Sequence, residues 1–112
     1  LNQFTTDKQI AEAMRFGLLD VLYSLLKDPI AEVKAKATEA IYLASAQTSG
    51  RREILKESNK KVKIWIDVIN DKSENIRKYA YDMILNLSKT MEGKVGFNFI
   101  DFSFQVTSNM IL

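Results

Sequence analysis

Apolar residues recur along most of the chain with the period of an α-helix. Between residues 33 and 44 they stand at i, i+4, i+7, i+8 and i+11, and the same spacing returns between residues 76 and 87. A single apolar stripe is typical of a helix that packs on a core with one face. The two stripes consist of Val33, Ala37, Ala40, Ile41 and Ala44, and of Ile76, Ala80, Met83, Ile84 and Leu87.

Shorter helices are predicted ahead of these two long ones. Residues 18–27 and 62–70 carry leucine, isoleucine, valine and tryptophan at helical spacing. Still shorter helical segments precede them, near residues 8–16 and 51–57. The chain is therefore expected to be all-α, with a short, a medium and a long helix in each unit.

The units form an internal repeat with a period of 43 residues. Residues 26–51 align with residues 69–94 without a gap, and the identities are Asp28/Asp71, Ala37/Ala80, Ile41/Ile84, Ser45/Ser88 and Gly50/Gly93. The same shift places residues 1–7 on residues 44–50. We therefore expect residues 1–94 to hold repeats: a partial copy at 1–7 and fuller copies at about 8–50 and 51–93.

Turn residues indicate where the long helices start and stop. Asp28 precedes Pro29, and Asp71 occupies the equivalent position in the second copy. A side-chain acceptor followed by proline predicts the N-cap and the first residue of a helix. Gly50 and Gly93 are predicted to follow helix ends, in the left-handed conformation that glycine adopts at little cost.

The C-terminal segment, residues 95–112, fits the repeat badly and is rich in phenylalanine. Residues 102–107 alternate between apolar and polar as a strand does. Two interpretations stay open for this atypical hydrophobic segment. It is either an end-cover or partner-docking tail, or a degenerate third copy or sequence foreign to the fold.

A repeat of this length with two or three helices is typical of armadillo and HEAT proteins. The segment GLLDVLYSLLKDPIAEVKAKATEAIYLAS, residues 17–45, resembles the armadillo pattern. The second copy is weaker, because Lys61 replaces the glycine, although Asn86-Leu87-Ser88 fits the usual end of the third helix. The resemblance implies a right-handed armadillo/HEAT-like helical solenoid of about two full repeats plus partial copies.

A narrower resemblance rests on AEAMRFGLLDVLYSLLKD, on KATEAIYLASAQTSGRREIL and on Glu92-Gly93-Lys94. These segments look like the radial spoke protein fourteen family of motile cilia, which has armadillo repeats. The resemblance implies a non-catalytic scaffold in the radial spoke of the ciliary axoneme, with other axonemal proteins as partners. The alternative is a generic cytoplasmic armadillo adaptor that binds a peptide or partner protein in its third-helix groove.

Composition excludes much of enzyme chemistry. The chain has no cysteine and no histidine, which removes thiol nucleophiles, the usual general base and the commonest metal ligands. Spacings typical of calcium or phosphate loops are also absent from the sequence. We therefore expect no enzyme activity, cofactor, metal or small-molecule substrate.

The predicted binding surface is the groove formed by the third helices. Import adaptors, which resemble this fold, place an asparagine on that helix and a tryptophan one turn earlier. Asn86 matches the asparagine, but Asp82 stands in place of the tryptophan, so the ladder is absent. The predicted groove residues are Glu39, Tyr42, Lys78, Asp82 and Asn86, and the two carboxylates are hypothesised to attract basic segments.

Charge offers a weaker hypothesis of nucleic-acid binding. The formal net charge is only +2. One local cluster is basic: Arg51, Arg52, Lys56, Lys60, Lys61 and Lys63. A solvated corner explains the cluster as well, since Trp65 beside it is in phase with core residues. No apolar run of about 18 residues predicts a membrane span, and no signal-peptide pattern is visible, so a cytoplasmic protein is expected.

Overall fold

The structure is a computed structural model that describes residues 7–90 and 93–111. Within these ranges every regular element is helical and no strand occurs, which confirms the all-α prediction. The elements are α1 (Asp7–Ala13), a π-helical turn η2 (Met14–Leu18), α2 (Leu19–Leu25), α3 (Ala31–Ser45), α4 (Thr48–Glu57), a 3-10 turn η3 (Ser58–Lys60), α5 (Val62–Ile69), α6 (Glu74–Leu87) and α7 (Gly93–Thr107).

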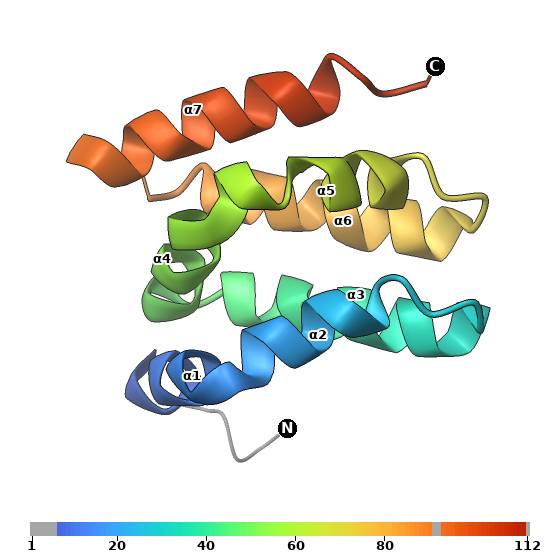
Figure 1. Cartoon of the computed structure of the whole chain (residues 1–112). Coiled ribbons are helices and arrows are strands. Elements are labelled where there is room, and N and C mark those ends of the chain that lie inside the picture. Colours follow the sequence, from blue (N-terminus) through green and yellow to red (C-terminus); the bar gives the residue numbers. More distant parts are fainter. Residues whose placement is uncertain (1–6, 91–92, 112) are drawn as a thin grey trace.

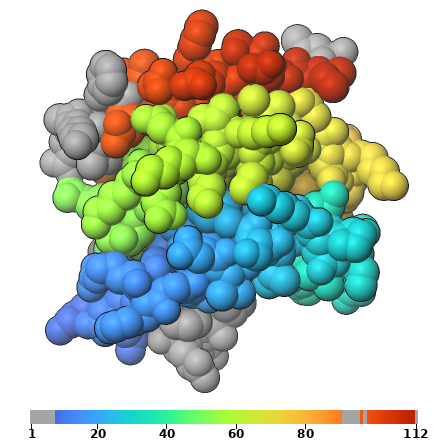
Figure 2. Space-filling view, in the orientation of Figure 1, coloured from blue at the N-terminus to red at the C-terminus, as the bar shows by residue number. Residues whose placement is uncertain are grey.

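The helices stack in chain order from α1 at one end to α7 at the other (Figures 1 and 2). The α2–α3 pair lies beside the α5–α6 pair, with α3 against α6. α1 and α4 pack together along one edge. α5 begins 43 residues after α2, and α6 begins 43 residues after α3. The second pair therefore begins at the same repeat positions as the first.

One hydrophobic core runs through the stack. Trp65 on α5 has no exposed surface, and its indole nitrogen donates a hydrogen bond to the hydroxyl of Tyr23 on α2, 3.3 Å away. The two rings meet edge to face with centroids 6.1 Å apart. This contact joins the two helix pairs, and it confirms that Trp65 is a core residue.

The long helices begin after a turn that an aspartate closes. Asp28 accepts a hydrogen bond from the backbone N–H of Ile30, and Asp71 accepts one from that of Ser73, both at 2.8 Å. Each helix begins directly after that extended residue. The prediction of Asp28 as N-cap and Pro29 as first helical residue was therefore wrong by two residues. The aspartate satisfies a donor of the turn instead of one in the helix.

Glycine conformations also differ from the prediction. Gly50 lies inside α4 and Gly93 begins α7, so neither follows a helix end. A Cβ atom on Gly50 would lie 2.0 Å from the carbonyl oxygen of Ala44, so the close approach of α4 to the end of α3 requires glycine. The left-handed glycine is Gly17, with φ of +108°, inside the kink between α1 and α2.

The strand-like alternation of residues 102–107 was misleading, because α7 is helical through Thr107. Phe102 and Val106 lie one helical turn apart and are fully buried. α7 packs across α5, η3 and α4. A helix satisfies its own backbone groups, whereas a strand here would need a neighbouring strand, and the described residues contain none.

A buried arginine ties three helices together. Arg51 on α4 donates to the hydroxyl of Thr90 at 2.7 Å, to the carbonyl of Ser45 at 3.0 Å and to the hydroxyl of Thr48 at 3.0 Å. Thr90 follows α6, and Ser45 ends α3. The guanidinium group therefore joins α4 to the C-terminal ends of both long helices.

Glycine is needed at Gly17 for its backbone conformation and at Gly50 for a close backbone contact, and replacement by alanine distinguishes the two. A Cβ on Gly17 meets nothing within 4 Å, so Gly17→Ala is expected to cost only the conformational term, about 1–2 kcal/mol. Gly50→Ala places a methyl group against backbone, and we expect a loss above about 2 kcal/mol. The free energy of unfolding in urea, measured for both variants, tests whether Gly50→Ala loses more stability than Gly17→Ala. Equal losses, or a larger loss for Gly17→Ala, contradict the prediction.

Candidate protein-binding surface

The predicted groove lies where α3 and α6 run side by side. Near the N-terminal end of α3, the ammonium group of Lys34 pairs with the carboxylate of Asp71. At the opposite end, the amide of Asn86 donates to the hydroxyl of Ser45 at 3.1 Å. These two contacts fix the register of α6 against α3.

Two tyrosines meet at the middle of this surface. The rings of Tyr42 on α3 and Tyr79 on α6 lie with centroids 5.7 Å apart and planes tilted by 32°. The hydroxyl of Tyr79 donates to the carboxylate of Glu39 at 3.3 Å. All three side chains are half-buried, so part of each tyrosine ring and of the carboxylate remains accessible.

Each predicted carboxylate has a lysine beside it on its own helix. Lys36 lies 3.8 Å from Glu39, and Lys78 lies 2.9 Å from Asp82. Exposed pairs of this kind add little stability, so a partner can displace them at small cost. The four charges cancel, and the surface therefore lacks the acidic excess on which the hypothesis of basic segments depended.

Tyr79 and Lys78 keep their ordinary protonation states at neutral pH. The carboxylate of Glu39 raises the pKa of the Tyr79 hydroxyl, and partial burial acts in the same direction. The hydrogen bond and charge of Asp82 raise the pKa of Lys78. At neutral pH, Tyr79 is therefore a protonated donor and Lys78 a cation. These groups suit hydrogen bonding and stacking, not nucleophilic chemistry.

The structure brings together four of the five predicted residues. Tyr79 contacts Glu39 and Tyr42, and Lys78 pairs with Asp82 on the same helix, whereas Asn86 lies further along α6 and uses its amide within the fold. Tyr79 was missing from the predicted set although it contacts two of its members. The sequence feature that points to Tyr79 is its separation of 37 residues from Tyr42. Lys34 and Asp71, which also pair between α3 and α6, are separated by the same 37 residues.

The basic cluster near Trp65 serves several separate contacts. Arg51 is buried in the hydrogen bonds described above. Lys56 pairs with Glu53 at 2.9 Å, and the ammonium group of Lys61 lies 5.2 Å from the ring centre of Tyr23. Among the described residues no group of three acidic, cysteine or histidine side chains is placed to hold a metal ion.

No protein-family model, curated protein or solved structure matches the chain. None of the described helices combines the length and the apolarity required to span a bilayer.

Asp71→Asn tests the contact that sets the register of α3 and α6. Burial opposes ionisation of Asp71, but hydrogen bonds from Lys34 and from the N–H of Ser73 prevail and lower its pKa. A lowered folded pKa stabilises the fold above the unfolded value of about 3.9, and this stabilisation is lost as pH falls through the folded value. We expect the variant to lose about 1–2 kcal/mol at neutral pH.

The free energy of unfolding in urea, measured from neutral pH down to about pH 2.5, checks this prediction. The difference between the variant and the natural chain should shrink as the solution is acidified. Asp67→Asn, on an exposed position of α5, is the matched control. A pH-independent difference, or an equal loss in the control, contradicts the role of the Asp71 charge.

Proposed function

We propose that the chain is a non-catalytic protein-binding module of the armadillo/HEAT-like solenoid type, and that it binds its partner on the α3–α6 surface. The observation that carries this proposal is the Tyr42–Tyr79 pair, which joins two stacked helices at an accessible surface. Tyrosine supplies a large apolar ring and a hydroxyl with little loss of side-chain freedom, which is why it is enriched at protein interfaces.

The charges around the tyrosines indicate how a partner is recognised. Glu39 and Asp82 are balanced by Lys36 and Lys78, so the surface has no net field to steer a charged ligand. Recognition by ring contacts and hydrogen bonds gives binding that depends weakly on salt. Nucleic acid, in contrast, would bind with a steep salt dependence.

The equal spacing of the two helix pairs supports the solenoid part of the proposal. α5–α6 follows α2–α3 after 43 residues and lies against it. Stacked pairs of this kind offer their long helices as a continuous surface. The resemblance to the radial spoke family supports an axonemal setting, in which the partner is another scaffold protein; a cytoplasmic adaptor with a peptide on α3–α6 is the alternative.

A localisation experiment with point variants tests the proposal. The tagged protein is expressed in ciliated cells, the membranes are removed with detergent, and the fraction retained on the axoneme is measured. We expect retention of the natural chain and a fall of about tenfold or more for Tyr79→Ala, since interface tyrosines often dominate binding.

Tyr81→Ala is the matched control, because Tyr81 is on the same helix and 50% exposed but makes no contact with Tyr42. Thermal unfolding of each purified variant separates lost binding from lost folding. Equal retention of Tyr79→Ala and Tyr81→Ala contradicts the α3–α6 surface. Release of the natural chain with the detergent-soluble proteins contradicts the axonemal setting. The cytoplasmic adaptor is then the remaining proposal.

A further inference from the structure

Apolar side chains are exposed at both ends of the helix stack, which runs from α1 to α7 (Figure 1). On the side of α2–α3 that faces away from α5–α6, two hollows are lined by residues that all precede α4. On the outer side of α7, three large apolar residues are more than half exposed. Apolar surface of this extent indicates an interaction site. The exposed apolar residues are Ile30 and Leu43 at the first end, and Ile100, Phe104 and Ile111 at the second.

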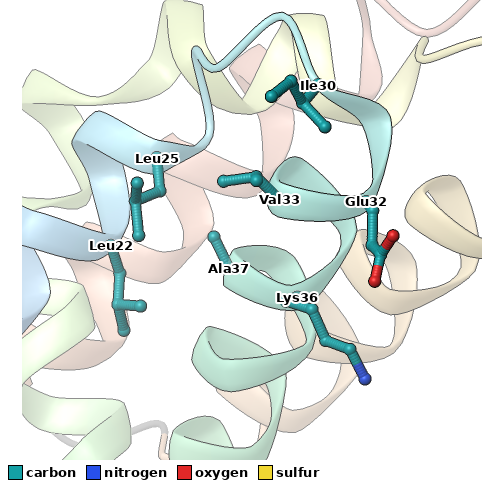
Figure 3. Close-up of a pocket in the computed structure, with 7 residues that line it drawn as sticks. All are labelled: Leu22, Leu25, Ile30, Glu32, Val33, Lys36 and Ala37. Atoms are coloured by element: carbon teal, nitrogen blue, oxygen red, sulfur yellow. The ribbon is translucent and has the colours of Figure 1, made fainter.

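The first end is concave, and we call it the N-terminal end face. Its two hollows measure about 360 and 380 Å³, and Leu22 lines both. Figure 3 shows the first hollow, where apolar side chains from α2 and α3 project toward one another: Leu22, Leu25, Val33 and Ala37. Ala40 and Ala44, each seven residues further along α3, line the second hollow. Two turns of helix therefore separate the hollows by about 10 Å.

The second end is a convex ridge along α7. Phe102 and Val106 are buried against the stack, whereas Ile100 and Phe104 lie on the opposite side of the helix, one turn apart. Phe104 is 71% exposed, and Ile111, which follows the helix, is 79% exposed. We call Ile100, Phe104 and Ile111 the α7 ridge.

Hydrogen bonds hold the far end of the α7 ridge in place. The amide of Asn70 donates to the carbonyl of Asn109 at 3.0 Å, and its oxygen accepts the N–H of Ile111 at 2.7 Å. The N–H groups of Asn109 and Met110 donate to the carbonyls three residues earlier, so the chain continues in tight turns. Ile111 therefore lies roughly 10–14 Å beyond Phe104, a spacing that matches the two hollows.

Charges at the edges of the two surfaces are opposite in sign. Lys36 lines the first hollow, and its side chain is 76% exposed. Asp101 flanks the α7 ridge beside Ile100 and is partly exposed. If α7 lies parallel to α3 with Phe104 at the first hollow, Asp101 comes within reach of Lys36 and Ile100 comes beside Ile30. The reverse direction places Asp101 at the far end of α3, so the charges select the parallel one.

The two ends are also large enough for a specific interface. The molecule measures 35 × 30 × 19 Å. One of its sides therefore offers between about 600 and 1,000 Å², and a standard interface buries about 800 Å² of each partner. A concave and a convex surface with matched spacing and opposite edge charges occur on the same chain, which favours a second copy as the occupant.

We propose that the α7 ridge of one copy of this chain docks in the N-terminal end face of a second copy. Phe104 fills the first hollow, Ile111 fills the second, and Asp101 meets Lys36. The two surfaces lie at opposite ends, so the association is head to tail and each added copy leaves one end face and one ridge free. The contact is made by α7, which departs from the repeat. The assembly uses neither Tyr42 nor Tyr79 and does not rest on the proposed function.

Sedimentation of the purified natural chain is the first test. At about 100 μM we expect a mean mass that rises with concentration and exceeds that of a dimer, because a head-to-tail contact does not close. A chain that stays monomeric at that concentration, or that stops at a dimer, would overturn the proposal.

Two complementary variants provide the sharper test. Leu43→Glu removes the end face and Phe104→Glu removes the ridge, so each variant alone should sediment as a monomer. An equimolar mixture should form a one-to-one dimer, with about twice the mass of either variant, because each supplies the surface that the other lacks. The dimer should grow no further.

Contrary outcomes identify the alternatives. A Phe104→Glu variant that still dimerises means that the end face pairs with itself, and a dimer of Leu43→Glu means that the ridge pairs with itself. A mixture that remains monomeric also overturns the proposal. Phe16→Glu is the matched control, since Phe16 is 87% exposed but lines neither hollow, and it should assemble as the natural chain does.

Thermal unfolding separates lost assembly from lost folding. Substitutions at exposed positions should shift the Tm of each monomer by no more than about 3 °C. Where glutamate lowers Tm further, serine at the same position takes its place in the mixture. Axonemal retention of Tyr79→Ala reports on the α3–α6 surface alone, so failure of either proposal is seen separately.

Discussion

The packing of α6 against α3 is the contact on which the rest of the structure depends. Two packed helices alone bury little apolar surface, so a neighbour that covers one side of a helix pair stabilises it. Ile76 and Met83 on α6 are fully buried there, and Arg51 joins the far ends of both helices. The same contact places Tyr42 beside Tyr79. The core and the candidate surface therefore have one physical origin.

Helices and their order followed from the sequence because apolar spacing reflects burial directly. Their boundaries required local geometry that spacing does not contain. Asp28 and Asp71 were rightly singled out, yet both close a turn ahead of the helix instead of capping it. Gly50 could not be interpreted without knowing that the backbone of Ala44 approaches it. In α7, Phe102 and Val106 are spaced so that they lie on one face of a helix and also on one face of a strand. The spacing alone does not distinguish the two, whereas the packing of α7 on α5 favours the helix.

The candidate surface was predictable in part for a similar reason. A repeat identifies equivalent positions, and Glu39 and Asp82 were chosen because they are equivalent. Residues that touch across the stack are not equivalent, since neighbouring helices meet about one turn out of phase. Tyr42 contacts Tyr79, which lies 37 residues later instead of 43. The charge of the surface also needed the structure, because Lys36 and Lys78 neutralise the two carboxylates only when the helices have formed.

A double-mutant cycle between Tyr42 and Tyr79 tests the central claim most directly, because it measures the α3–α6 register at the proposed surface. Each tyrosine is replaced by alanine singly and together, and the free energy of unfolding is measured in urea. Aromatic pairs contribute about 0.5–1.5 kcal/mol beyond the area that they bury, and we predict a coupling energy in that range. A coupling energy near zero would mean that the two rings do not meet. That result would contradict both the stacking of the helix pairs and the surface proposed to bind a partner.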